Sequence, residues 1–229
     1  MSGPGRAISI DSRKAQLGLL LAAMLVAALV VPTGLTALAG VSPPVQTFTD
    51  VPPSHPFYDE IEWMAAEGIS EGFQPGPTYR PNNPVSRGAM AAFMYRLAGE
   101  PVFGAPGTPS FPDVGTSHPF YDEIEWLKAE DITGGFPDGT FRPGAAVTRQ
   151  SMSAFMYRLA GEPPFTSPGV ATFPDVSTSH PFFDEIEWMA DEDITTGFND
   201  GTFKPSANVT RQAMSAFMKR LAEGPGVGV

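Results

Sequence analysis

The clearest pattern along the chain is an apolar stripe that recurs three times at helical spacing. Each stripe places methionine, phenylalanine, methionine and leucine at positions i, i+3, i+4 and i+7, on one face of an α-helix. A serine or threonine suited to an N-cap precedes each stripe, and a glycine suited to a C-cap follows it. The sequence therefore predicts three helices with N-caps Ser86, Thr148 and Thr210 and C-caps Gly99, Gly161 and Gly224.

A shorter amphipathic segment precedes each of these helices. In the first copy Phe57, Ile61, Met64 and Ala65 form an apolar stripe, and the predicted helices cover residues 56–67, 119–130 and 181–192. Each begins at the proline of a Ser-His-Pro triplet, because proline suits the first helical position. Before each triplet stands the pattern F-x-D-V. We expect it to be extended, because proline disfavours helix for the residue that precedes it.

The two helices of each copy are joined by a segment that predicts a tight turn, with a minimal hairpin as one option. It reads GFPDGTFRP over residues 135–143 and GFNDGTFKP over residues 197–205. Asp-Gly between two aromatic residues favours such a turn. The first copy differs, since residues 72–81 read GFQPGPTYRP, one residue longer and without the Asp-Gly pair.

These elements recur as units spaced 62 or 63 residues apart. The repeats cover residues 48–98, 111–160 and 173–222, and a two-helix unit of this size cannot bury its apolar face alone. We therefore predict a mainly α-helical fold in which three helix–turn–helix repeats pack with pseudo-threefold symmetry around a three-helix bundle. Recurring polar residues would line the grooves between repeats. The anchors of the register are Asp50, Asp113 and Asp175, a tryptophan thirteen positions on (Trp63, Trp126, Trp188) and an arginine 36 or 37 positions on (Arg87, Arg149, Arg211).

Composition narrows the function classes. With 42% hydrophobic and 17% charged residues the chain can bury a core, and the absence of cysteine excludes disulfides and thiolate sites. Residues 40–229 hold 11 basic and 24 acidic residues, because three basic residues and one acidic residue precede them, so their net charge is −13. A nucleic-acid-binding protein needs a basic face, so the sequence predicts no nucleic-acid partner.

The N-terminus resembles a targeting segment. Arg6, Arg13 and Lys14 precede an apolar run over residues 15–31, and Ala37-Leu38-Ala39 has the small-x-small pattern of a cleavage site. We expect residues 1–39 to be a signal peptide, with a retained membrane anchor as the alternative, because the run is at the lower limit for a spanning helix. Either interpretation places the repeats outside the cytoplasm.

The repeated arginines and aspartates are the candidate binding residues. Arginine in the first turn of a helix opposes the helix dipole, so it needs a reason. One reason is a bidentate grip on an acidic group of a glycan, and the other is a salt bridge to the repeated aspartates. Those aspartates could equally tie down a loop by accepting backbone hydrogen bonds.

Other repeated residues have structural alternatives. The histidines at positions 55, 118 and 180 could converge on a metal, but capping or packing is the stronger interpretation, and we predict no metal and no cofactor. The tryptophans favour packing over a sugar platform. Acidic pairs such as Asp59/Glu60 recur three times, whereas hydrolysis needs one asymmetric pair, and no catalytic motif is present. We therefore expect no enzymatic activity.

Taken together, F-x-D-V, a helix ending near Gly-Phe, D-G-T-F-x-P and Thr-Arg at the start of a second helix resemble the S-layer homology (SLH) domain. The resemblance covers residues 48–222 and implies a helical pseudo-trimer that binds secondary cell-wall polymers, often pyruvylated, and holds proteins to the bacterial surface. Carried over by position, the implied ligand-binding residues are Asp50, Asp113, Asp175, Arg87, Arg149, Arg211, Gly72, Gly135 and Gly197.

Two departures from the family pattern affect the expected site. Proline stands at positions 56, 119 and 181 where the family has tryptophan, so the aromatic residue is lost or displaced to Phe57, Phe120 and Phe182. The family's T-R-A-E lacks its glutamate here, which removes half of a capping box. The expected function is noncovalent attachment to the cell envelope through wall glycans. The alternative is an extracellular array whose grooves bind partner proteins, including other surface proteins.

Overall fold

A computed structural model describes residues 46–224 of the chain. The predicted targeting segment, residues 1–39, lies outside the described residues. Within the described range no helix is long and apolar enough to cross a membrane. Each repeat contributes one short and one long helix, in the order α2 (Tyr58–Ala66), α3 (Arg87–Leu97), α4 (Tyr121–Ala129), α5 (Arg149–Leu159), α6 (Phe183–Asp191) and α7 (Arg211–Glu223).

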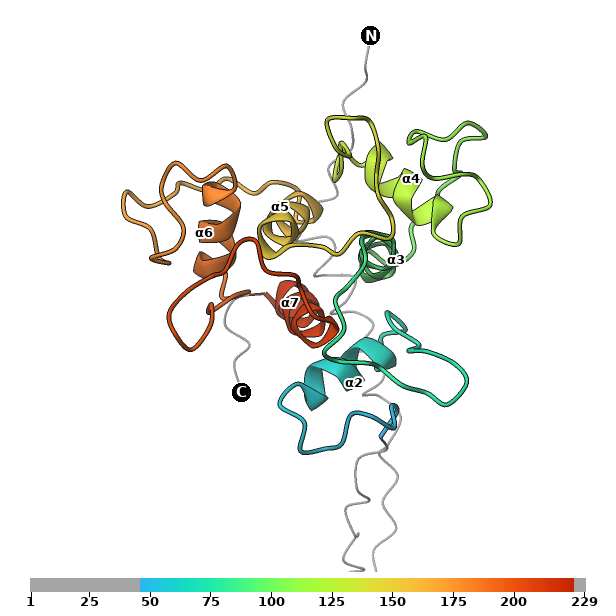
Figure 1. Ribbon diagram of the computed structural model, residues 1–229, viewed down its shortest axis with the longest axis horizontal. Helices are drawn as coiled ribbons and strands as arrows, with labels where there is room; N and C mark the ends of the chain where they lie inside the picture. Colours follow the sequence, from blue (N-terminus) through green and yellow to red (C-terminus); the bar gives the residue numbers. More distant parts are fainter. Residues whose placement is uncertain (1–45, 225–229) are drawn as a thin grey trace, which may run out of the picture.

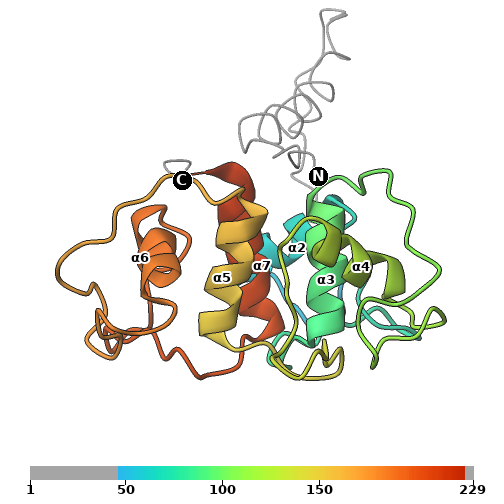
Figure 2. The ribbon, with the colours of Figure 1, turned by 90° about the horizontal axis from the view of Figure 1, so that it is seen from above.

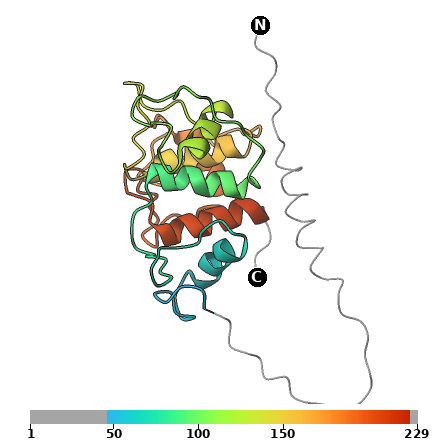
Figure 3. The same cartoon turned by 90° about the vertical axis from the view of Figure 1, so that its right-hand side faces the viewer.

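The long helices stand at the centre and the short helices lie outside them, which gives the three lobes of Figure 1. Figures 2 and 3 show α3, α5 and α7 side by side and roughly parallel. Each short helix packs on the long helix of the preceding repeat, α4 on α3 and α6 on α5. The first short helix, α2, packs on α7 of the last repeat, so the chain closes into a ring.

A cycle of backbone hydrogen bonds joins the three repeats just before the long helices. The N–H of Val147 donates to the carbonyl of Val85 at 2.9 Å, and Val209 donates to Val147 at 2.8 Å. The N–H of Val85 donates in turn to the carbonyl of Val209 at 2.9 Å. The predicted pseudo-threefold arrangement is confirmed, and these cyclic contacts mean that residues 46–224 close their own core.

The methionine–phenylalanine stripes form much of that core. Met90, Met94, Met152 and Met156 are fully buried, as are Met214 and Met218 of the last repeat. One cluster of buried side chains runs through all three repeats. The predicted caps are also confirmed, since the side chains of Ser86, Thr148 and Thr210 each accept a hydrogen bond from the N–H three residues on. Gly99, Gly161 and Gly224 all have positive φ.

Two local predictions are wrong. The short helices begin two residues later than the proline, because the imidazole Nδ1 of each histidine accepts the N–H two residues on and holds a turn there, as His118 does with Phe120. The F-x-D-V segments are turns rather than extended, as the hydrogen bond from the N–H of Val114 to the carbonyl of Phe111 at 3.1 Å shows. Proline biased the expectation, but in each repeat the valine N–H donates to the carbonyl of the phenylalanine and closes a turn.

The loop between the helices is a tight turn, as predicted. In the second repeat the N–H of Phe136 donates to the carbonyl of Thr140 at 2.8 Å. The longer loop of the first repeat makes the same closing bond, from Phe73 to Thr78, and contains a cis peptide bond before Pro75.

Candidate functional site

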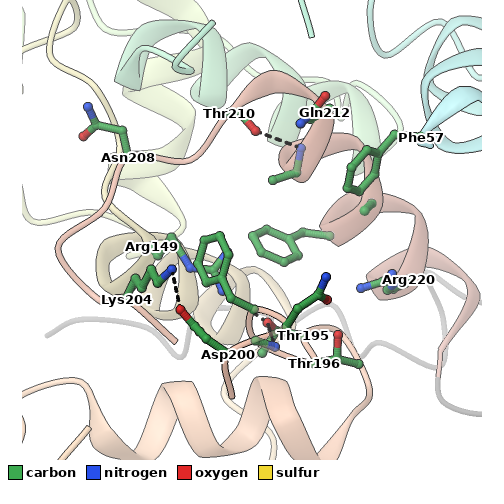
Figure 4. A pocket seen from close by; sticks show the side chains of 16 residues that line it. Phe57, Arg149, Thr195, Thr196, Asp200, Lys204, Asn208, Thr210, Gln212 and Arg220 are labelled. Atoms are coloured by element: carbon green, nitrogen blue, oxygen red, sulfur yellow. Dashed lines mark hydrogen bonds and ion pairs between the residues drawn. The ribbon is translucent and has the colours of Figure 1, made fainter. Parts of the chain in front are cut away.

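A groove of about 650 Å³ lies where all three repeats meet (Figure 4). We call it the Arg149 groove. Arg149 comes from the second repeat and Phe57 from the first, whereas the other lining residues belong to the third repeat. They lie on the loop 195–200, on the segment that leads to α7 and along one side of α7, from its first turn to Arg220 in its last turn. The lining residues of the third repeat include Gly197, Phe198, Asp200, Lys204, Gln212 and Arg220.

Arg149 lies at the base of this groove within a cage of aromatic rings. Its guanidinium carbon is 4.7 Å from the ring centroid of Phe198 and 4.5 Å from that of Phe203, and the ring of Phe217 is at 5.4 Å. Its Nε donates to the carbonyl of Phe203 at 2.5 Å. The side chain is 6% exposed. Cation–π contacts and a carbonyl therefore stabilise this charge.

The same cage recurs at the other two junctions. Arg87 reaches into the second repeat, where its Nε donates to the carbonyl of Phe141, and Arg211 reaches into the first repeat and donates to Tyr79. Burial lowers the pKa of Arg87 and of Arg149 to about 10, so both remain charged at neutral pH. Among residues 46–224 these arginines form no ion pair. The salt bridge to the repeated aspartates, one of the two alternatives considered for these arginines, is not formed, and carbonyl and aromatic contacts take its place.

The aspartates tie the loop in place. The two carboxylate oxygens of Asp113 accept the N–H groups of Phe141 at 2.8 Å and Arg142 at 2.6 Å. Asp50 and Asp175 make the equivalent pairs. Desolvation raises the pKa of the Asp113 carboxyl, but the backbone hydrogen bonds outweigh it and hold that pKa below its usual value. Asp175 does not line the Arg149 groove. The structure therefore gives these aspartates the loop-tying role that the sequence left open.

The repeated glycines allow a close approach. Gly135 has a φ of +75°, and a Cβ there would lie 2.6 Å from Cε1 of Phe111 and 2.8 Å from the carbonyl oxygen of Thr140. Gly72 and Gly197 have the same geometry against Phe48 and Phe173. Gly197 also lies on the groove wall. Only glycine fits this combination of backbone conformation and packing.

Two of the three repeated tryptophans are packing residues, the role that the sequence favoured over a sugar-binding platform. Trp126 and Trp188 are 2% exposed and make edge contacts with Tyr95 and Tyr157, at centroid distances of 5.3 and 5.2 Å. Trp63 is only partly buried. Its repeat packs on α7, where Lys219 stands in place of the tyrosine.

Several groove residues escaped the sequence analysis. Lys204 and Gln212 are ordinary surface residues by pattern, and Arg220 has the position of a helix-end charge. In the structure Arg220 Nη1 donates to the carbonyl of Ile194 at 3.2 Å while it lines the groove. Phe57 also lines the groove, across the opening from Arg149 and Lys204. By its sequence position it is a candidate both for a core residue and for a displaced aromatic residue. Contacts between repeats bring these residues together, and sequence spacing does not reveal such contacts. Alignment of the repeats could only have marked them as equivalent positions.

The groove is cationic although the chain is acidic. Arg149, Lys204 and Arg220 face a single carboxylate, that of Asp200, which forms an ion pair with Lys204 Nζ at 2.8 Å. The backbone donors at the start of α7 are already used, since the N–H of Gln212 donates to the carbonyl of Pro81 and that of Ala213 to Thr210. A ligand would therefore meet side-chain donors and aromatic faces rather than a helix N-terminus. Figure 4 shows these side chains around the opening.

Two curated relatives are an anchoring protein and a cell surface glycoprotein. The chain is 28% identical over 160 residues to a cellulosome-anchoring protein of Acetivibrio thermocellus, which covers 66% of this chain and 35% of that protein. It is 26% identical over 166 residues to cell surface glycoprotein 1 of the same organism, which covers 66% of this chain and 7% of that protein. The match thus spans about a third of the first relative and a small part of the second.

The family assignment rests on the repeats themselves. The sequence pattern of the S-layer homology domain matches three consecutive segments, residues 47–91, 110–153 and 172–215, which together make up more than half of the chain. Each matched segment contains one arginine that lies in an aromatic cage, one aspartate that ties the loop in place and one closely packed glycine. The chain belongs to the S-layer homology domain family.

Proposed function

We propose that this chain attaches noncovalently to the bacterial cell envelope by binding wall polysaccharide in the grooves between its repeats. Membership of the S-layer homology family and the similarity to an anchoring protein and a cell surface glycoprotein support attachment at the cell surface. The role is binding rather than catalysis. The repeats carry the same residues three times, and a threefold-repeated polar set suits repeated binding rather than one asymmetric reaction.

The observation that carries the proposal is the makeup of the Arg149 groove. Aromatic side chains from two repeats, Phe57 and Phe198, lie beside the cations Arg149, Lys204 and Arg220. Aromatic faces pack against the apolar faces of sugar rings, whereas guanidinium and ammonium groups bind carboxylates or phosphates. The groove therefore fits an acidic glycan, and of the residues inferred from the family it uses Arg149 and Gly197 directly.

The three junctions would act together. Cages around Arg87, Arg149 and Arg211 stand at pseudo-equivalent places, so one chain offers several sites to a repeating polymer. Binding at one groove raises the effective concentration of polymer at the next, so weak sites can give firm retention. Asp50, Asp113 and Asp175, together with Gly72 and Gly135, would hold the groove loops in shape. A direct contact of these residues with the glycan stays a prediction.

Co-sedimentation with protein-free cell walls tests the proposal. Residues 40–229, which contain the whole described core, should sediment with the walls, and soluble wall polysaccharide should compete. Arg149→Ala combined with Arg211→Ala should release the protein. Because both arginines are buried, circular dichroism must show that the double variant is folded. Lys204→Gln with Gln212→Ala is a second test that leaves the cages intact and should also weaken binding.

The matched control is Lys128→Gln, because Lys128 lies on the short helix α4 and does not line the groove. Wall binding that is unchanged in both groove variants would contradict the site. A wild-type chain that does not sediment with walls would contradict the function and favour a surface array that binds partner proteins.

A further inference from the structure

Among the positions at which the three junctions differ is one that lines the groove, the residue after the cage arginine in each long helix. It is glutamine at positions 150 and 212 and glycine at position 88. Gln212 lines the Arg149 groove, and the repeat equivalence gives Gln150 the corresponding place at the junction that contains Arg87, since the N–H of each donates to the proline carbonyl of the next repeat in the ring. Gly88 has that place at the junction that contains Arg211. We call these junctions the Arg87 and Arg211 grooves.

The glycine changes the shape of its wall as well as its chemistry. A Cβ at Gly88 would lie 2.9 Å from Cδ2 of Phe120 and 3.3 Å from the carbonyl oxygen of Pro143. The ring of Phe120 therefore lies directly against the backbone of α3, in the space that a glutamine side chain takes elsewhere. Gly88 is buried, whereas Gln150 and Gln212 are half-buried. The amide of glutamine offers two donors and an acceptor, and glycine offers none.

The distribution of charge predicts the opposite order of affinity among the grooves. In the second and third repeats the loop carboxylate pairs with the cation four residues on, Asp138 with Arg142 at 2.7 Å and Asp200 with Lys204 at 2.8 Å. The longer loop of the first repeat has no aspartate, and Arg80 stacks on Phe73 at 4.0 Å. If charge alone governed binding, the Arg211 groove would hold an acidic sugar most tightly.

We infer that the chain binds acidic sugars in two grooves of three, with Gln150 and Gln212 as ligand-contacting residues, and that Phe120 against Gly88 makes the Arg211 groove the weak site. The inference rests on the proposed function for its ligand class. A missing amide hydrogen bond to a charged or hydroxyl group corresponds to roughly a tenfold loss of affinity. Polymer retention would then come from two neighbouring sites.

Site-resolved NMR tests this inference. Uniformly ¹⁵N-labelled residues 40–229 would be titrated with D-glucuronate, and with D-glucose as the uncharged control. The backbone and side-chain amides of Gln150 and Gln212 should shift in a saturable way, whereas the amide of Gly88 and its neighbours should shift at concentrations about tenfold higher. Gln212→Ala should weaken the Arg149 groove by about the same factor and leave the Arg87 groove unchanged, which makes the second groove an internal control.

A pair of variants completes the design. Because Phe120 is the counterpart of Phe57, Phe120→Ala removes an aromatic face as it opens space, so Phe120→Ala is the reference, and Phe120→Ala with Gly88→Gln should bind more tightly than this reference because it adds the amide. Equal or tighter binding at Gly88 in the wild-type protein would overturn the inference, as would the absence of glucuronate shifts in all grooves. Shifts in two grooves by a protein that fails to sediment with cell walls would support the inference and reject wall attachment.

Discussion

Tyr79 and Arg211 exchange hydrogen bonds across the junction that closes the ring. The tyrosine hydroxyl donates to the carbonyl of Arg211 at 3.0 Å, and Nε of Arg211 donates to the carbonyl of Tyr79 at 2.6 Å. The equivalent residues in the other repeats, Phe141 and Phe203, have no hydroxyl. The extra bond thus occurs at the junction between the first and last repeats, which no linker of the chain connects directly.

Tyr79→Phe should therefore lower the free energy of unfolding by about 1 kcal/mol, the net value of one buried hydrogen bond. Urea denaturation followed by circular dichroism measures this change. Tyr157→Phe is the control, since its hydroxyl bonds to the carbonyl of Pro163 in a partly exposed linker. A larger loss in the control than in Tyr79→Phe would contradict a special role for the closing junction.

The same residue should make stability fall at alkaline pH. Burial raises the pKa of Tyr79 from 10.0 to about 12, and the nearby Arg211 and Ser215 act in the opposite direction. A raised folded pKa gives stability that is present below pH 10 and is lost as pH rises from 10 towards 12. Over that window the unfolding midpoint should fall more steeply for the wild-type protein than for Tyr79→Phe. Parallel curves would show that the hydroxyl does not carry the effect.

Asp113→Asn should destabilise the second repeat. The amide nitrogen would face a backbone N–H that now donates to a carboxylate oxygen, and loss of such a charged hydrogen bond costs about 2 kcal/mol. The pKa of Asp113 is below its usual value, so its contribution is present above pH 4 and is lost as pH falls through the folded value. Acid titration of the melting temperature checks both points. Asp122→Asn, an exposed position on α4, should change little.

Gly135→Ala should cost about 2 kcal/mol or more, because the new Cβ meets the ring of Phe111 and the carbonyl of Thr140 at a positive φ. The adjacent Gly134 has open space around its Cα and no positive φ, so Gly134→Ala is a matched control that should be nearly neutral. Thermal unfolding of the two variants gives the comparison. Similar losses in both would mean that the loop, rather than the contact with Phe111, limits stability.

Lys219→Tyr should stabilise the protein. It restores at the closing junction the tyrosine that packs on Trp126 and Trp188 at the other two, a contact worth about 0.5–1 kcal/mol. The partly exposed Lys219–Glu223 pair that it removes is long, at 3.8 Å, and contributes little. Urea denaturation and the fluorescence of Trp63 would report the change, with Lys219→Ala as the control. A destabilised tyrosine variant would show that the partly exposed Trp63 has another partner.

The sequence by itself determined the repeat, the long helices and the stripes that form the core, because these depend on local spacing. Ser86, Thr148 and Thr210 cap helices wherever the chain places them, and methionines at i and i+4 share a face in any context. The resemblance carried by F-x-D-V and Thr-Arg was enough to assign the family. It also identified Arg149 and Gly197, both of which line the groove.

The tertiary structure decided which repeat each side chain serves. Arg149 is encoded in the second repeat but lies in a cage built by the third, and Phe57 of the first repeat completes the same groove. Sequence spacing gives no distance between repeats, so it could not separate the loop-tying aspartates from the groove cations. Nor could it show that Phe120 fills the space beside Gly88. Those outcomes follow from ring closure, which brings side chains of all three repeats to a single junction.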